Sequence, residues 1–229
     1  MAGLVEMASA IMGGAQRRLE IAAANVSNGA TPGYKRVSPV RSSSSPYAQA
    51  ADRVRVGMDQ GKLRATGRPL DLAIAGEGLF QVRAGDRLLY TRQGQFSVDA
   101  DGAVVSAQGH PLQQAGGGDL MVGAGAVVVD PDGTVTEDGR PVGRIALFRT
   151  TDAANLSPVN GTLFALTDAE EVDAPQLRQA MLEASTVELG TEMVSMMAAL
   201  READAGAKLV QTYDDLIGRA ITTFGGTGR

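Results

Sequence analysis

Residues 193–224, MVSMMAALREADAGAKLVQTYDDLIGRAITTF, contain two interleaved apolar series at seven-residue steps. One series is Met193, Leu200, Ala207, Asp214 and Ile221, and the other is Met196, Ala203, Val210, Ile217 and Phe224. Together they have the alternating spacing of a coiled-coil seam, which Asp214 interrupts. No proline follows Pro175, so the pattern predicts one helix, about 45 Å long at about 1.5 Å per residue. Such a helix needs a partner for its apolar stripe.

The N-terminal stretch has a matching pattern and is the predicted partner. Two seven-residue series alternate large residues with alanine: Val5, Met12, Leu19 and Val26, and Ala8, Ala15 and Ala22. The alanines predict close approach of a neighbouring backbone. The Asn28-Gly29 and Pro32-Gly33 pairs end the helix near residues 25–28. The first helix leans basic and the second acidic, which is consistent with pairing. The alternative is that each is an ordinary amphipathic helix on a globular core.

Composition excludes several functions. The net charge is −5, which argues against a general nucleic-acid binder. The chain has no cysteine and only one histidine, His110, so thiolate chemistry and most histidine metal sites are excluded. No apolar run is long enough to predict membrane insertion, and the N-terminus lacks the pattern of a cleaved signal peptide.

The middle of the chain changes to the pattern of short strands. From Gly67, apolar runs alternate with turn residues, and strands are expected at residues 70–74, 79–83, 88–92, 95–98, 103–105, 127–129, 134–136, 144–149 and 163–166. Asp-Gly and Gly-Asp pairs between these runs predict hairpins. The spacing favours a sandwich or barrel-type β domain. Residues 42–46, Ser-Ser-Ser-Ser-Pro, predict a flexible loop, with a short strand at 53–56.

No catalytic, cofactor-binding or metal site is expected, and the chain is not predicted to be an enzyme. Asp99 and Asp101 begin like a calcium loop but lack its closing glutamate, and aspartates commonly cap turns. Residues 76–78, Gly-Glu-Gly, lack the third glycine of a dinucleotide fingerprint. His110 lies in a predicted turn, where a surface histidine is a better interpretation than a catalytic base.

Three stretches together resemble one family. Residues 19–36, LEIAAANVSNGATPGYKR, resemble the N-terminal signature of bacterial flagellar axial proteins. Residues 67–82, GRPLDLAIAGEGLFQV, with 90–96, YTRQGQF, are similar to the start of the β domain shared by rod and hook proteins. Residues 181–187, MLEASTV, with Glu192, Met193 and Val194, resemble the junction that leads into the C-terminal helix of the family. Thr186 departs from the asparagine that is usual there.

The resemblance implies an α+β fold and a structural function. Paired terminal helices are expected at 1–30 and 186–224, a linker with a short β segment at 31–66, and a β domain at 67–185. The expected function is a subunit of the flagellar basal-body rod, polymerised into the helical tube that transmits motor torque across the periplasm. A proximal rod position is favoured, and a distal rod or hook-type subunit is the close alternative. A coiled-coil-tethered β binding module or adhesin is the alternative from another class.

The resemblance also implies partners and site residues. The expected partners are other rod and hook proteins, copies of the chain itself and the flagellar type III export apparatus, with export that needs no cleaved signal peptide. The expected turn motif after the first helix is Asn25, Asn28, Thr31, Pro32, Gly33, Tyr34 and Lys35. The expected helix–helix and assembly interface is Val5, Ala8, Met12, Ala15, Leu19, Ala22, Val26, Met193, Met196, Leu200, Ala203, Ala207, Val210, Ile217 and Ile221.

Overall fold

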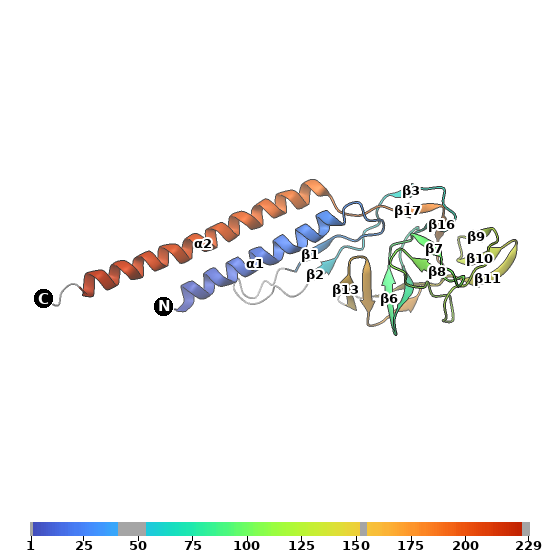
Figure 1. Cartoon of the computed structure of the whole chain (residues 1–229), viewed down its shortest axis with the longest axis horizontal. Helices are drawn as coiled ribbons and strands as arrows, with labels where there is room; N and C mark the ends of the chain where they lie inside the picture. Colours follow the sequence, from blue (N-terminus) through green and yellow to red (C-terminus); the bar gives the residue numbers. More distant parts are fainter. Residues whose placement is uncertain (1, 41–53, 152–154, 226–229) are drawn as a thin grey trace. The chain divides into compact units, whose positions relative to one another are not determined.

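A computed structural model describes residues 2–40, 54–151 and 155–225. One helix precedes a β-rich region and a second, longer helix follows it, so the α+β class is confirmed (Figure 1). The helices are α1 (Ala2–Ser27) and α2 (Leu189–Gly225). The strands are β1 (Val37–Pro39), β2 (Val54–Val56), β3 (Leu63–Ala65), β4 (Leu72–Ile74), β5 (Leu79–Ala84), β6 (Arg87–Thr91), β7 (Phe96–Val98), β8 (Val104–Ser106), β9 (Val127–Val129), β10 (Thr134–Glu137), β11 (Arg140–Arg144), β12 (Leu147–Arg149), β13 (Leu156–Asn160), β14 (Leu163–Leu166), β15 (Glu170–Glu171), β16 (Leu177–Gln179) and β17 (Met181–Glu183).

The chain folds into two units, each made of segments that are distant in sequence. The helical unit contains residues 2–27, 37–40, 54–55 and 188–225 of the described chain. The β unit contains residues 28–36 and 56–187, with 152–154 outside the described residues. The domain boundaries expected at residues 30, 66 and 185 stay predictions.

In the helical unit, α1 packs along α2, and the two helices lie side by side in Figure 1. The predicted end of the first helix near residues 25–28 is confirmed, because α1 stops at Ser27. The predicted loop at 42–46 lies outside the described residues, and so does Arg53 of the strand expected at 53–56.

In the β unit, the largest sheet has six strands in the order β13-β14-β6-β5-β12-β15. Its inner face contributes Phe80, Val82 and Leu147 to the core, where Ile145 and Leu112 join them. The ring of Phe80 meets that of Phe96 edge to face, with 5.3 Å between their centroids, an arrangement that aromatic quadrupoles favour. The remaining strands form a three-stranded sheet, β11-β10-β9, and several two-stranded pairs.

The predicted hairpin turns are confirmed and one predicted strand is corrected. Gly85-Asp86 joins β5 to β6, residues 99–102 join β7 to β8, and Asp132-Gly133 lies between β9 and β10. The single strand expected at 144–149 is instead two strands, β11 and β12. They belong to different sheets, so the chain must change direction between them. No sheet closes into a barrel among the described residues, and the sandwich or barrel type stays a prediction.

Three of the edge strands carry features that discourage further pairing. Pro158 lies in β13, at one edge of the six-stranded sheet, and β15 at the other edge has only two residues. Pro141 lies in β11, which is an edge of the three-stranded sheet and begins and ends with arginine. Proline cannot donate a ladder hydrogen bond, and short or charged edges are poor templates for another strand.

Candidate assembly interface

The seam between α1 and α2 is built from small residues. Ala8, Ala15 and Ala22 are 1–2% exposed, as their seven-residue spacing predicted. On α2 the most buried positions are Glu192, Ala199 and Gly206, also seven residues apart. A side-chain carbon at Gly206 would lie 2.7 Å from Cγ of Met12 and 3.5 Å from the carbonyl oxygen of Ala8. The two backbones therefore approach closely.

Polar contacts show that the helices are antiparallel. Arg18 of α1 forms an ion pair with Glu202 of α2. Nδ2 of Asn25, further along α1, donates to Oε2 of Glu192, earlier in α2, at 3.1 Å. Gly206, later in α2, meets Met12 and Ala8, earlier in α1. Residue numbers of facing positions therefore sum to about the same value throughout the pair.

The larger predicted interface residues divide between the seam and its flanks. Leu19, Val26, Met196, Ala203, Ala207, Val210 and Ile217 are partly buried, and the side chain of Ile221 lies outside the described residues. Val5 and Met12 are exposed, and so are Met193 and Leu200, at 58% and 49%. Met193 and Leu200 therefore lie outside the seam within one chain. Because the backbones lie close together, alanine and glycine occupy that line instead. A role between copies stays a prediction for these residues.

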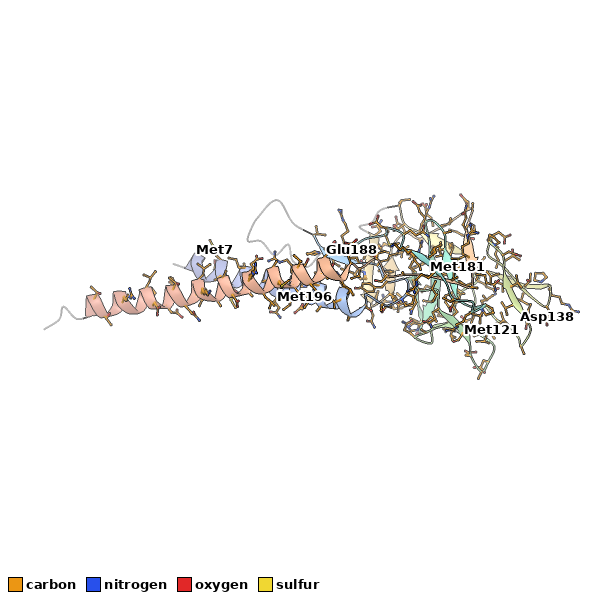
Figure 2. The ribbon with its side chains drawn as sticks, turned by 90° about the horizontal axis from the view of Figure 1, so that it is seen from above. Met7, Met121, Asp138, Met181, Glu188 and Met196 are labelled. Atoms are coloured by element: carbon orange, nitrogen blue, oxygen red, sulfur yellow. The ribbon has the colours of Figure 1, made fainter. Side chains whose placement is uncertain are left out.

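The second helix is longer than its partner can cover. Because Gly206 faces Ala8 and Met12, the antiparallel register brings α2 level with the start of α1 near residue 215. Residues 216–225 of α2 therefore extend past the described end of α1, as the red end of the helix does in Figure 1. Figure 2 shows the same helix from another side, with Met196 labelled in its first half.

Asn25 joins three elements of the helical unit. Its side chain is fully buried. Nδ2 donates to the carbonyl oxygen of Val37 at 2.8 Å, and Oδ1 accepts from the N–H of Val37 at 3.0 Å. With the further bond to Glu192, the amide ties the end of α1 to β1 and to the first turns of α2. A buried amide with all these partners specifies one arrangement.

The predicted turn motif continues in the β unit, where its backbone is tightly enclosed. The hydroxyl of Thr31 donates to Oδ1 of Asn28 at 3.2 Å, and Pro32 follows in the turn. Gly33 has a φ of +69°, and a side-chain carbon there would overlap the backbone of Arg92. The N–H of Gly33 donates to the carbonyl oxygen of Glu183 at 2.8 Å. Tyr34 is 3% exposed. Only glycine fits at residue 33 without strain.

Lys35, the last residue of the motif, belongs to a buried charge cluster that the sequence analysis missed. We call Lys35, Arg92 and Glu183 the charge clamp. Nζ of Lys35 lies 2.7 Å from Oε1 of Glu183, and Nε of Arg92 lies 2.6 Å from Oε2. All three side chains are 0–2% exposed. The N–H of Gly61 also donates to Oε1, at 2.6 Å.

Both cations of the charge clamp have further partners. Nζ of Lys35 donates to the carbonyl oxygen of Asp59 at 2.6 Å. The guanidinium of Arg92 donates to the carbonyl oxygens of Ile74, Gly76 and Gly78. The clamp therefore joins the turn motif, the loop before β3, the turn before β5 and strand β17. Its two cations and one anion leave one excess positive charge, which the surrounding carbonyl dipoles offset in part.

Burial and charge pull the pKa values in the clamp in opposite directions. Burial alone would raise the pKa of the Glu183 carboxyl, but Arg92, Lys35 and the N–H of Gly61 together hold that pKa below its ordinary value. Burial lowers the pKa of the Lys35 ammonium, and Arg92 adds to this, against the opposing effect of Glu183. Because Glu183 is the one anion of the charge clamp, it compensates the positive charges of Lys35 and Arg92.

The acidic side chains of the described residues form no metal site, and some of them cap turns. No cluster of three or more His, Asp or Glu side chains there could hold a metal ion. Asp99 and Asp132 accept backbone N–H groups within their own turns, which is the turn-capping role predicted for such residues. No helix of the described chain is both long and apolar enough to cross a membrane. The notable surfaces are therefore those of the helix pair.

Comparisons with known proteins match nearly the whole chain. Residues 73–137 match the family model of the flagellar hook protein FlgE/F/G D1 domain, and residues 178–223 match that of the flagellar basal body rod FlgEFG protein C-terminal region. A flagellar basal-body rod protein FlgF from Caulobacter vibrioides is 31% identical over 92% of this chain and 93% of its own length. FlgF from Escherichia coli is 28% identical over 91% of this chain and 94% of its own.

A second kind of relative also matches the chain. The flagellar basal-body rod protein FlgG from Bacillus subtilis is 31% identical over 67% of this chain and 65% of its own length. The fold and these matches define the class: an axial protein of the bacterial flagellum. The chain belongs to the family of flagellar basal-body rod proteins, and FlgF is the favoured member type. The predicted function as a structural subunit of the rod is confirmed at this level.

Proposed function

We propose that the chain polymerises, with itself and with other rod and hook proteins, into the helical tube that transmits motor torque across the periplasm. In this proposal the helical unit provides the inner wall and the β unit, with its expected sandwich or barrel architecture, the outer layer. The chain reaches this place through the flagellar type III export apparatus without cleavage of a signal peptide. It acts by mechanical contact and performs no catalysis.

The observation that supports this most directly is the composition of the helix pair. Its seam uses alanine and glycine, while methionine and leucine side chains remain on the outside of both helices. Soluble monomers rarely expose an extended apolar surface of this kind, and such surfaces mark sites of association. Long lateral contacts between helices would also resist twisting of the assembled tube.

The charge clamp supports a role of the β unit in transmitting torque. It joins the segment that arrives from α1 to the strand that leads toward α2. Backbone bonds add to this connection: the N–H of Thr186 donates to the carbonyl oxygen of Tyr34 at 3.1 Å, and the N–H of Arg36 to Oγ1 of Thr186 at 2.9 Å. The two chain segments that lead to the helical unit are therefore bonded to each other within the β unit.

The proposal can be tested in cells that lack the chain. Electron cryo-microscopy of basal bodies from these cells should show an incomplete rod, and the cells should not swim. Restoring the full chain with a small tag should restore the rod and place the density of the tag within it. A complete rod and normal swimming without the chain would contradict the proposal.

A further inference from the structure

The two flanks of the helix pair differ in character. Relative to the buried alanines of α1, and at about 100° per residue, Arg18 lies roughly 60° to one side. Glu202 lies roughly 60° to the corresponding side of Ala199 on α2. These two residues form an ion pair, so equal displacements on the two antiparallel helices fall on the same flank. The Arg18–Glu202 ion pair therefore lies on that flank of the seam.

The opposite flank is apolar along most of the pair. Large apolar residues of both helices lie on the other side of the seam. They are displaced from the buried positions by roughly 40–120°, at about 100° per residue. We call these residues the apolar face: Val5, Met12 and Leu19 of α1 with Leu189, Met193 and Leu200 of α2. All except the partly buried Leu19 are exposed. The face adjoins the seam itself, since Met12 meets Gly206.

The end of α2 offers a complementary surface. Leu209 and Leu216 are seven residues apart, 44% and 60% exposed, and lie on the flank opposite to the apolar face. Leu216 lies in the part of the helix that extends past α1. The charged residues of 209–225 are Asp214, Asp215 and Arg219, and Glu20 and Asp204 lie at the border of the apolar face. The match between the two surfaces is therefore apolar, with large exposed side chains on the apolar face and exposed leucines seven residues apart on the end of α2.

We propose that the apolar face of one copy binds the free end of α2 from a second copy, through Leu209 and Leu216. A helix with leucines at seven-residue spacing fits between two helices by knobs-into-holes packing. Because the two surfaces are different parts of the molecule, the contact is heterologous, and each added copy presents a new apolar face. This inference rests on the proposed function, since it names the contact by which copies of the chain meet in the rod.

Cross-linking of the full-length chain tests the contact. The chain has no cysteine, so introduced thiols report only on the chosen positions. One variant carries Leu200→Cys with Leu216→Cys, and another carries Leu200→Cys with Leu209→Cys, to allow either direction of the incoming helix. A short bismaleimide, added to concentrated protein, should give a ladder of dimers, trimers and longer chains in at least one variant.

Two control variants decide how the ladder is interpreted. Leu200→Cys alone should stay monomeric, because the proposed contact does not bring two apolar faces together. Val194→Cys with Leu216→Cys should give no ladder, because Val194 is more exposed than Leu200, at 62%, but lies on the back of α2. The proposal is overturned if neither Leu200 pair gives a ladder, if Leu200→Cys alone forms dimers, or if the Val194 pair gives an equal ladder.

Failure of this contact and failure of the proposed function give different results. If cells without the chain still build complete rods, the proposed function fails whatever the cross-linking shows. If the rod needs the chain but neither cysteine pair gives a ladder, the rod function stands and this contact is wrong.

Discussion

At the scale of single residues, the charge clamp shows how the β unit holds the segment that follows α1. A buried ion pair adds little compared with a well-packed apolar core, but removal of one partner leaves an uncompensated charge. Glu183 is the only anion among the three clamp residues, so it compensates both Lys35 and Arg92. The three residues therefore do not contribute equally to the stability of the β unit.

We expect Glu183→Gln to lower the free energy of unfolding by about 3–5 kcal/mol, because both cations stay buried without their counter-charge. Lys35→Met should cost less, since it leaves Arg92 and Glu183 as a neutral pair. Urea titration followed by circular dichroism measures both. Glu171→Gln is the matched control: its ion pair with Arg144 is nearly half exposed, so the change should be within about 1 kcal/mol. Equal effects of Glu183→Gln and Glu171→Gln would contradict this role.

The clamp also predicts how stability depends on pH. The pKa of Glu183 is held below its ordinary value. Its contribution is therefore fully present above about pH 4.3, the ordinary value, and is lost as the pH falls through the folded-state pKa. Unfolding midpoints in urea between about pH 2 and pH 7 should fall less steeply on the acid side in Glu183→Gln than in the parent chain. Parallel curves would show that another carboxyl group dominates the acid response.

Gly33 allows backbone strain to be separated from steric overlap. Gly33→Ala places a methyl group against the backbone of Arg92 at a positive φ, whereas Gly85→Ala, also at a positive φ, meets open space. Gly85→Ala should cost about 1 kcal/mol, and Gly33→Ala clearly more. Thermal unfolding of both variants measures the difference. Equal losses would mean that the turn shifts to make room.

At the scale of elements, the sequence predicted the existence of the helices better than their contacts. The seven-residue series of Ala8, Ala15 and Ala22 lies on the buried side of α1. On α2 the same reasoning favoured Met193 and Leu200, because large apolar residues are the usual core of a seam. The close approach at Gly206 instead selects Ala199 and its neighbours on that line. Periodicity gives the spacing of a stripe, but the partner decides which stripe is buried.

The β unit shows a similar limit. Turn residues such as Asp132-Gly133 specify hairpins locally, so those pairings could be predicted. The pairing of β17 with β3, and of β16 with β4, joins segments more than a hundred residues apart that carry no local turn signal. The charge clamp depends on the same distant pairing. Only a weak local signal was present: Glu183 follows the apolar residues Met181 and Leu182, where a charge needs a partner, whereas Arg92 lies in the polar stretch Thr-Arg-Gln.

The seam between the helices predicts a size limit at Ala15. Ala15→Leu should force α1 and α2 apart, because Ala15 is almost fully buried between close backbones. The helical signal at 222 nm should melt at a lower temperature. Ala23→Leu, at an exposed position of the same helix, should leave the melting unchanged. An unchanged signal in Ala15→Leu would mean that the helices do not approach closely in solution.

At the scale of the whole molecule, the protection of backbone amides from hydrogen exchange should vary in a defined order along the chain. In hydrogen exchange of the free chain, residues 216–225 should exchange fastest among the described helical residues, because no part of α1 faces them. Residues 192–206 should be slower, and the amides around Phe80 and Ile145 slowest, because they lie in the β core. Mass spectrometry of the exchanged chain measures this order. Equal protection of 192–206 and 216–225 would contradict the register of the helix pair.

The proline-bearing and shortened sheet edges bear on how crowded copies behave. When many β units lie close together, unpaired edge strands would tend to pair with strands of neighbouring molecules and start disordered aggregates. Three edges are poor templates for such pairing. They are β13 with Pro158, β11 with Pro141, and the two-residue strand β15. Contact between copies through these three edges is therefore disfavoured.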